Sequence, residues 1–358
     1  MGAFMDFIVE RENLRHGKFE SVPSAPLSDG QARLAIKKFA FTANNVTYGA
    51  VGELVGYWNF FPTEAGWGRI PVWGIAAVDE SKHPDMPEGE RVYGYLPMST
   101  ELVIEPGNVT AHGLIDASAH RAALPPVYNQ YTRLAAQPGY DRAQDDRMML
   151  LQPLFTTSFL IDDFLDDNDF FGARTVVVLS ASSKTAFSLA YLLSKNRECE
   201  VVGLTSPGNV SFVQGLGCYD RTVAYPDLGG LPKGEVVLVD MAGNAGVLRA
   251  AHEHFGDGVK YSCQVGITHW EEQGATQGLP GAEPQFFFAP SQVEKRRADW
   301  GAGGFQQRVQ DSWREFLTGT DGWLEIVQGR GPEDVERVYL ATVEGRANPR
   351  QGHILSVE

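Results

Sequence analysis

The chain has 358 residues, and at roughly 100–200 residues per domain this length predicts two domains. Hydrophobic residues make up 43% and charged residues 21%, an ordinary globular composition that excludes a disordered chain. The formal net charge of −15 argues against a nucleic-acid-binding protein, whose affinity depends on neutralising phosphates.

The three cysteines, Cys199, Cys218 and Cys263, are too few and too widely spaced to predict a disulfide framework or a zinc site. No apolar run reaches the roughly 18 residues that a membrane-spanning helix needs. The first residues also lack the apolar centre of a signal peptide. We therefore expect a cytoplasmic protein that binds a small-molecule substrate and associates with neither a membrane nor nucleic acid.

Residues 31–110 alternate short apolar runs with turn signals, a pattern typical of a compact β-rich domain. The predicted strands lie at 32–41, 71–78, 91–98 and 100–106. A polar segment, 135–147, follows them, and we interpret it as a loop beside the junction between the two domains.

From residue 150 onward, strand-like and helix-like segments alternate. The β-branched run at 176–180 is typical of a strand that is buried on both faces. Further strands are predicted at 200–206, 221–225, 234–243 and 259–268, and helices at 150–165, 181–195, 210–217 and 247–256. This alternation predicts an α/β fold with a doubly wound parallel sheet over roughly residues 150–290.

The end of the chain is predicted to contain helices at 305–317 and 331–345 and a short strand at 353–357. These elements need a partner surface, and packing against the first domain would provide one.

The turn after the first strand of the parallel sheet, residues 179–186, is the candidate phosphate-binding site. Ligands of doubly wound sheets bind at the carboxyl ends of the strands, and a helix N-terminus attracts phosphate. The turn lacks the glycines of the dinucleotide-binding pattern. In their place stand Ser182, Ser183, Lys184 and Thr185. These side chains can bind phosphate; alternatively, a serine only caps the helix and the lysine is solvated.

The end of the second strand bears on the choice between NADPH and NADH. An acid at this position would bind the ribose 2′-hydroxyl, and residues 204–209 contain none. We therefore predict NADPH, with Ser206 and Asn209 as donors to its 2′-phosphate and Arg221 or Tyr225 approaching from the next strand. The alternative is that this segment forms only a turn.

The order of a β-rich domain, a doubly wound domain and a returning tail resembles the medium-chain dehydrogenase/reductase superfamily. Segments that resemble landmarks of its quinone oxidoreductases are 42–48, where an Asn-containing loop follows the first long strand, 71–74, 88–94, 155–158 and 323–357. The resemblance implies a GroES-like domain of residues 1–149, completed by 305–358, and a Rossmann domain of residues 150–304. It also implies a homodimer.

A narrower resemblance is to DUF2855, a group of uncharacterised bacterial proteins without an assigned function. It is carried by residues 127–133, 153–165, 182–186, 286–290 and 299–305.

Zinc-dependent members of the superfamily carry an early catalytic cysteine and a cluster of four cysteines, whereas the first 198 residues here contain none. His83, His112 and His120 of the first domain are interpreted as scattered surface residues. The resemblance therefore implies a zinc-independent quinone or enoyl reductase.

Without a metal, reduction of a double bond needs a proton or hydrogen-bond donor, for which tyrosine is suited. The resemblance places Tyr48 and Tyr57 near the nicotinamide, and Asn45 near the ribose or a substrate carbonyl. It also places Thr157 beneath the nicotinamide, and Gly266 completes the set of cofactor-binding candidates. Alternatively, the two tyrosines are half-buried aromatic residues with one solvated end.

The sequence leaves more than one role open for the aromatic loop 52–68, for Arg133 and for the basic cluster 295–297. The aromatic loop 52–68 is a lid, a dimer contact or a satellite core. Arg133 and the basic cluster 295–297 bind an anion or make ordinary surface contacts, and the acidic run 162–169 is interpreted as a solvated helix end.

The function we predict is zinc-independent, NADPH-dependent reduction of an activated carbon–carbon double bond in an enone, an enoyl thioester or a quinone. One alternative is a repurposed binding protein that has lost the dinucleotide, which the glycine-free turn favours. Another is a lyase or isomerase without net redox chemistry.

Overall fold

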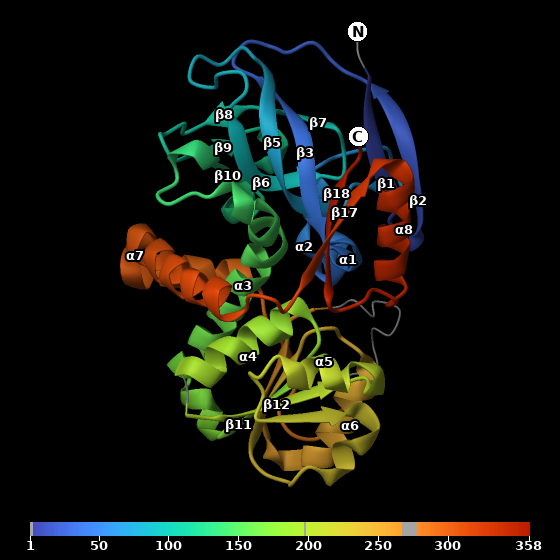
Figure 1. The fold of residues 1–358 in the computed structure, drawn as a ribbon, viewed down its shortest axis with the longest axis vertical. Coiled ribbons are helices and arrows are strands. Elements are labelled where there is room, and N and C mark those ends of the chain that lie inside the picture. The colour runs from blue at the N-terminus through green and yellow to red at the C-terminus, as the bar shows by residue number, and fades with distance from the viewer. Residues whose placement is uncertain (1–2, 197, 267–277) are drawn as a thin grey trace. The chain divides into compact units, whose positions relative to one another are not determined.

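The computed structural model describes residues 3–196, 198–266 and 278–358 (Figure 1). The chain divides into two compact units. The first contains residues 1–150 together with 325–358, and the second contains residues 151–324.

The first unit is built on a nine-stranded mixed sheet. In spatial order its strands are β17 (Glu325–Arg330), β18 (Gln351–Ser356), β3 (Ala32–Phe41), β5 (Pro71–Ser81), β6 (Arg91–Pro97), β10 (Gln130–Arg133), β9 (Gly113–Asp116) and β8 (Pro106–Gly107), with β7 (Glu101–Ile104) paired to β3. The four strands predicted for this unit are confirmed as β3, β5, β6 and β7. Buried side chains of β3, β5 and β6, such as Leu34, Val72 and Val92, contribute to the core.

A second sheet of three strands was not predicted. Its strands are β2 (Asn13–Pro23), β1 (Ala3–Glu10) and β4 (Trp67–Gly68). β1 and β2 form an antiparallel hairpin in which Phe7 pairs with Phe19.

The helices of the first unit are α1 (Ala43–Ala50), α2 (Gly52–Val55) and α8 (Gly331–Val343), with 3₁₀ turns η1 (Tyr57–Asn59), η2 (Ala119–Arg121), η3 (Pro126–Asn129), η4 (Leu134–Ala136) and η5 (Arg142–Gln144). The segment 42–48, which resembled a loop, is the start of α1. The polar segment 135–147 is not one continuous loop, because it contains η5 and the first turn of α3 (Asp145–Asp167).

The tail of the chain returns to the first unit. β18 pairs with β3 in antiparallel register, with His353 opposite Phe41. Tyr339 of α8 is fully buried and donates a hydrogen bond to the Leu14 carbonyl at 2.5 Å. The C-terminal segment is therefore an integral part of this unit (Figure 1).

The second unit contains a six-stranded, fully parallel sheet. Its spatial order is β13 (Arg221–Ala224), β12 (Glu200–Thr205), β11 (Thr175–Leu179), β14 (Val236–Asp240), β15 (Val259–Gln264) and β16 (Pro284–Phe286). The β-branched residues 176–178 are at most 1% exposed, because β11 is covered on both faces. The predicted doubly wound sheet is confirmed, and its strand order is that of dinucleotide-binding domains.

The helices of the second unit are the remainder of α3, α4 (Lys184–Asn196), α5 (Val210–Gly215), α6 (Ala245–Phe255) and α7 (Ala289–Gly319), with 3₁₀ turns η6 (Asp169–Gly172), η7 (Pro207–Asn209), η8 (Tyr225–Gly230) and η9 (Gly256–Gly258). None of the described helices combines the length and apolar character needed to cross a bilayer.

Residues 305–324 belong to the second unit, whereas the resemblance assigned them to the first domain. The predicted helix at 305–317 is the part of α7 that follows a backbone kink at Gly301. Its buried side chains Trp313 and Phe316 explain the difference, because their rings lie 5.4 and 4.9 Å from the ring of Phe155 in the same unit.

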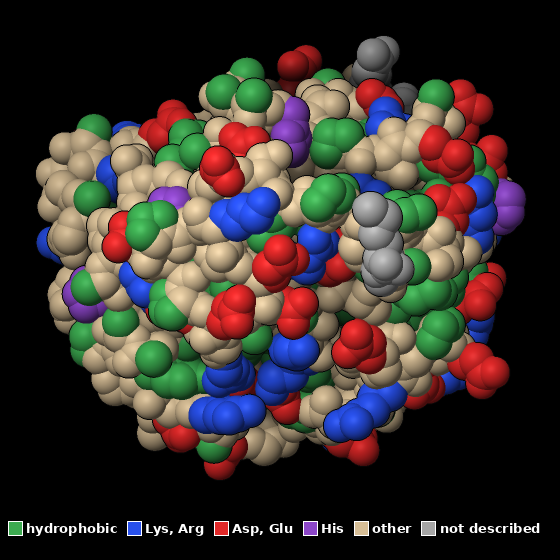
Figure 2. Space-filling view, turned by 90° about the horizontal axis from the view of Figure 1, so that it is seen from above, with side chains coloured by type: hydrophobic (Ala, Val, Ile, Leu, Met, Phe, Trp, Pro, Cys, Tyr) green, Lys and Arg blue, Asp and Glu red, His purple; other side chains and the backbone are tan. Residues whose placement is uncertain are grey.

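Acidic and basic side chains are interspersed on the face seen in Figure 2. The net charge of −15 is therefore not gathered into one continuous acidic patch on this face.

Candidate active site

The turn between β11 and α4 occupies the switch point of the parallel sheet, because β12 and β14 flank β11 on opposite sides. Ser180, the first residue after β11, has a φ of 61°. Side chains disfavour this left-handed region, in which glycine is at ease. The Ser180 hydroxyl lies 3.3 Å from the Tyr225 hydroxyl. The turn therefore adopts a backbone conformation typical of glycine without containing one. It also lies in contact with Tyr225, one of the predicted cofactor-binding residues.

Two serines of the turn have identifiable partners. The Ser183 hydroxyl oxygen accepts from the Ala186 N–H at 3.2 Å, which is the helix-capping role considered as its alternative. The Ser182 hydroxyl oxygen accepts from the side-chain amide of Asn209 at 3.1 Å. Ser182 and Asn209, both predicted cofactor-binding residues, therefore meet across the ends of β11 and β12.

Lys184 is the first residue of α4 and is half-buried. Burial lowers the pKa of its ammonium group to about 8. A phosphate at this helix N-terminus would offset the cost of burying that charge, and the N–H groups of the first turn would donate to the same anion. The turn therefore fits a phosphate group in charge and donor chemistry, although it lacks the expected glycines.

The other cofactor-binding candidates are less closely tied to this turn. The Thr157 hydroxyl donates within α3 to the Pro153 carbonyl at 3.2 Å. The Thr185 carbonyl accepts from the Ser158 hydroxyl at 2.8 Å, which anchors the start of α4. Ser206 directly follows β12, and the buried Gly266 lies beyond β15, two strands from β11.

The prediction that Arg221 approaches the end of the second strand is wrong. Arg221 is the first residue of β13, and its Nε lies 2.6 Å from a carboxylate oxygen of Glu200, the first residue of β12. Because the strands are parallel, both residues lie at the amino edge of the sheet, opposite the phosphate turn.

Asp240, which the sequence reasoning missed, is the last residue of β14 and is 2% exposed. Its Oδ1 accepts from the backbone N–H groups of Ala242 and Gly243 at 3.1 and 3.0 Å. Its Oδ2 is buried and has no hydrogen-bond partner among the described residues. Burial raises the pKa of this carboxyl group to about 6. The sequence signal that could have identified Asp240 is an acidic residue at the end of a buried strand.

Asp240 also acts on Tyr225. Burial raises the pKa of the Tyr225 hydroxyl, and the nearby Asp240 carboxylate raises it further. Ser180, Tyr225 and Asp240 thus form one polar cluster at the carboxyl edge of the sheet.

The first unit contains a cluster of buried tyrosines that includes both catalytic candidates. The Tyr57 and Tyr128 hydroxyls lie 3.0 Å apart, and the rings of Tyr48 and Tyr57 are 4.7 Å apart. Trp73 donates from Nε1 to the Tyr48 hydroxyl oxygen at 3.3 Å. Burial raises the pKa of both Tyr48 and Tyr57, so both hydroxyls keep their protons at neutral pH.

The two adjacent asparagines of α1 have different surroundings. Asn45 is 3% exposed; its side chain accepts from the Thr42 N–H at 2.8 Å and donates to the Pro71 carbonyl at 2.9 Å. It therefore holds the start of α1 in place. Asn44 is half-buried, and its hydrogen bond to Tyr48 lowers the pKa of that hydroxyl against the effect of burial. Asn44 is accordingly the asparagine that faces the candidate donor.

The aromatic loop 52–68 forms a satellite core, because Trp58, Phe60 and Phe61 are at most 2% exposed. Arg133 makes a structural tie, with its Nε 2.6 Å from Glu90 and its Nη1 donating to the Thr110 carbonyl at 2.8 Å.

The basic cluster 295–297 and the acidic run 162–169 pair with each other. Arg296 lies 2.5 Å from Asp163, and Lys295 lies 2.8 Å from Asp167. The acidic run is therefore an ion-paired helix end rather than a purely solvated one. Among the described residues, no group of three or more His, Cys, Asp or Glu side chains is arranged to hold a metal ion.

A family model, DUF2855, described as a protein of unknown function, matches residues 39–348. No curated protein matches the sequence. Among solved structures, CurA from Vibrio vulnificus in complex with NADPH has a TM-score of 0.65 at 12% identity, over 99% of each chain. A putative NADPH:quinone reductase from Bacillus thuringiensis has a TM-score of 0.59 at 10% identity, again over 99% of each chain.

The yhdH oxidoreductase from Salmonella enterica in complex with NADP has a TM-score of 0.54 at 14% identity, over 99% of this chain and 100% of that one. These likenesses confirm the expected fold, a GroES-like domain combined with a Rossmann domain as in the medium-chain dehydrogenase/reductase superfamily.

Proposed function

The chain belongs to the DUF2855 family, and we propose that it is a zinc-independent, NADPH-dependent reductase of an activated carbon–carbon double bond. The observation that carries the proposal is the turn Ser180–Lys184, which stands at the switch point of a parallel sheet with the dinucleotide-binding strand order. Structures with the same fold that hold NADPH or NADP, such as CurA and yhdH, support this choice of cofactor.

In this proposal the Lys184 ammonium group and the N–H groups at the start of α4 bind the phosphates of the cofactor. Ser206, Asn209 and Tyr225 surround its adenosine half, where the absence of an acid after β12 favours a 2′-phosphate. The nicotinamide, when bound, supplies the hydride.

Tyr48 is the proposed donor to the substrate. Trp73 donates to its oxygen, and Asn44 stabilises the ionised form, so the hydroxyl proton is available to an acceptor outside this pair. Its raised pKa keeps the proton on the hydroxyl, which can then donate a hydrogen bond to an enone or thioester carbonyl.

Titration of the purified protein with NADPH and NADH tests the cofactor assignment. We expect NADPH to bind more tightly than NADH, and Lys184→Ala to weaken NADPH binding at least tenfold, since a charge-assisted hydrogen bond contributes about 1.5–3 kcal/mol. Lys195→Ala, at the exposed end of the same helix, is the matched control and should bind like the wild type. Because the pKa of Lys184 is about 8, wild-type affinity should fall as the pH rises past 8, and the Lys184→Ala variant should lose this dependence.

Turnover of enones and quinones tests the chemistry. Tyr48→Phe should lower kcat by about 10²-fold or more while NADPH affinity is retained. Tyr261→Phe, a partly buried tyrosine of β15, is the matched control. Absence of binding by either dinucleotide to the folded wild type would overturn the proposal and favour a repurposed binding protein.

A further inference from the structure

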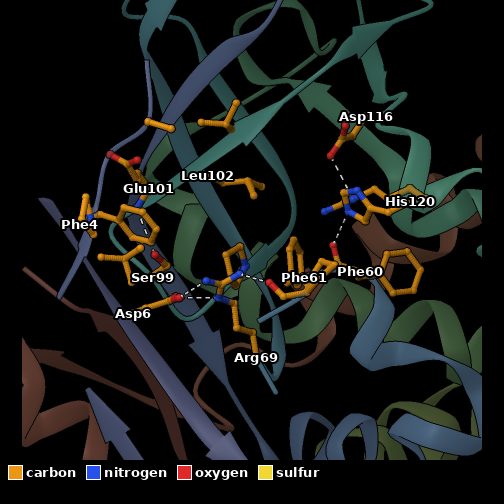
Figure 3. A pocket seen from close by; sticks show the side chains of 17 residues that line it. Phe4, Asp6, Phe60, Phe61, Arg69, Ser99, Glu101, Leu102, Asp116 and His120 are labelled. Carbon is orange, nitrogen blue, oxygen red and sulfur yellow. Dashed lines mark hydrogen bonds and ion pairs between the residues drawn. The ribbon is translucent and has the colours of Figure 1, made fainter. Parts of the chain in front are cut away.

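A cavity of about 360 Å³ opens in the first unit beside β1, β7 and the aromatic loop (Figure 3). Its volume lies at the lower end of the roughly 300–1,000 Å³ typical of small-molecule sites. Much of its lining is apolar and includes Phe4, Phe60, Phe61, Leu102 and Val103. The residues assigned above to the cofactor and to hydrogen donation do not line it. The cavity is therefore a feature that the proposed reductase activity does not use.

The three acidic side chains that line the cavity are each neutralised by an arginine. Asp6 accepts from Nε of Arg69 at 2.5 Å, as the dashed lines in Figure 3 show. Asp116 lies 3.0 Å from Nε of Arg121. Glu101 lies 2.6 Å from Nη1 of Arg33, which stands behind it. A cation therefore gains little in this cavity, because every carboxylate already has a partner.

The guanidinium group of Arg121 has hydrogen-bond donors that the described residues do not fully satisfy. The residue is 1% exposed, and its guanidinium lies over the rings of Phe61 and Phe60, at 4.7 and 5.6 Å. Its Nη1 and Nη2 are buried and have no hydrogen-bond partner of good geometry among the described residues, while the guanidinium lowers the pKa of the adjacent Tyr131 hydroxyl against the effect of burial. The neighbouring Tyr131 hydroxyl gives its proton to the Tyr95 carbonyl at 2.8 Å.

Leaving buried charged donors unpaired is costly, and a guanidinium fork matches a carboxylate in shape and charge. Since Arg121 is otherwise enclosed, an incoming group reaches it through the cavity that it lines. We propose that this cavity binds a small carboxylate with an aromatic or branched aliphatic body. The carboxylate lies on Nη1 and Nη2 of Arg121, and the body lies among Phe60, Phe61 and Leu102. This site is separate from the proposed reductase function.

Calorimetry and ligand-observed NMR on the full chain, without nucleotide, test the site with phenylacetate and its neutral analogue phenylacetamide. We expect phenylacetate to bind, and phenylacetamide to bind at least tenfold more weakly. Leu102→Trp fills the cavity and should abolish binding. Leu54→Trp adds the same side chain at a position that is 81% exposed, and should bind like the wild type.

The role of Arg121 needs a paired substitution, because removing the arginine alone would leave Asp116 buried and unpaired. The double variant Asp116→Asn with Arg121→Gln removes both charges, and Asn retains the acceptor for the Ser118 and Glu105 N–H groups. It should bind the acid and the amide within twofold of each other.

Equal binding of acid and amide to the wild type, or no binding of phenylacetate at 10 mM, would overturn the proposal. Undiminished binding to the Leu102→Trp variant would do so as well. Because no nucleotide is present, the outcome does not depend on whether the chain is a reductase.

Discussion

Asp240 illustrates how one buried side chain ties the candidate site to stability. Its pKa of about 6 in the folded protein lies above the ordinary value of 3.8, so between these values the folded state binds more protons than the unfolded state. The contribution of Asp240 to stability must therefore fall as the pH rises from about 4 to about 7. A pKa difference of about 2 corresponds to roughly 3 kcal/mol, of which on the order of 2 kcal/mol is lost between pH 4 and pH 7.

The variant Asp240→Asn should lack this loss, because Asn accepts from the Ala242 and Gly243 N–H groups without carrying a charge. Urea unfolding at pH 4, 5, 6 and 7 measures the effect as the difference between wild type and variant. Other acids with raised pKa values, such as Asp6 and Asp163, titrate in both proteins and cancel in this difference. A difference that stays constant over the range would contradict the assigned pKa.

At the scale of elements, the phosphate turn depends on the strand beside it. A Cβ at Gly203 in β12 would come within 2.8 Å of the Tyr219 ring and 2.9 Å of the Ala181 Cβ. Gly203→Ala should therefore push the turn outwards and destabilise the second unit by about 1–3 kcal/mol. Thermal unfolding measures this.

Gly208→Ala is the matched control for Gly203→Ala. Gly208 lies just beyond the same strand, and nothing stands within 4 Å of its added Cβ. This variant should unfold within about 0.5 kcal/mol of the wild type. Equal effects of the two substitutions would show that close packing at Gly203 is not what supports the turn.

The elements that could be predicted are those whose pattern is local. A strand buried on both faces is a continuous β-branched run, so β11 was evident from residues 176–178. The hairpin β1–β2 was not evident, because much of β2 is partly exposed and β1 carries the buried acid Asp6. The arginine that makes this acid tolerable, Arg69, is 63 residues away in the sequence.

At the scale of the whole molecule, the candidate site divides in the same way. The Ser–Lys turn is a local motif and was found from sequence. The contact between Tyr57 and Tyr128 joins residues 71 positions apart, and no local pattern of the sequence predicts such a contact. The sequence analysis named Asn45, and it could not show that Asn44 is the asparagine that contacts Tyr48. Only the packing of α1 decides which of the two is buried against Pro71.

The first unit depends on the end of the chain. Leu355 in β18 is 1% exposed and stands opposite Phe39 of β3. Leu355→Ala should cost about 2–5 kcal/mol through the cavity it leaves. Hydrogen exchange should then accelerate in β3 and β5, more than 270 residues earlier in the chain, while the parallel sheet keeps its protection.

Leu238→Ala is the reciprocal control, because Leu238 is fully buried in β14 of the second unit. It should accelerate exchange in β11, β12 and β14 and leave β3 and β5 protected. Both variants replace a buried leucine by alanine, so the total loss of stability should be similar. The strands that lose protection from hydrogen exchange then distinguish the two units. Loss of protection throughout the chain in both variants would contradict the division at residues 150 and 325, and would mean that the two units unfold as one.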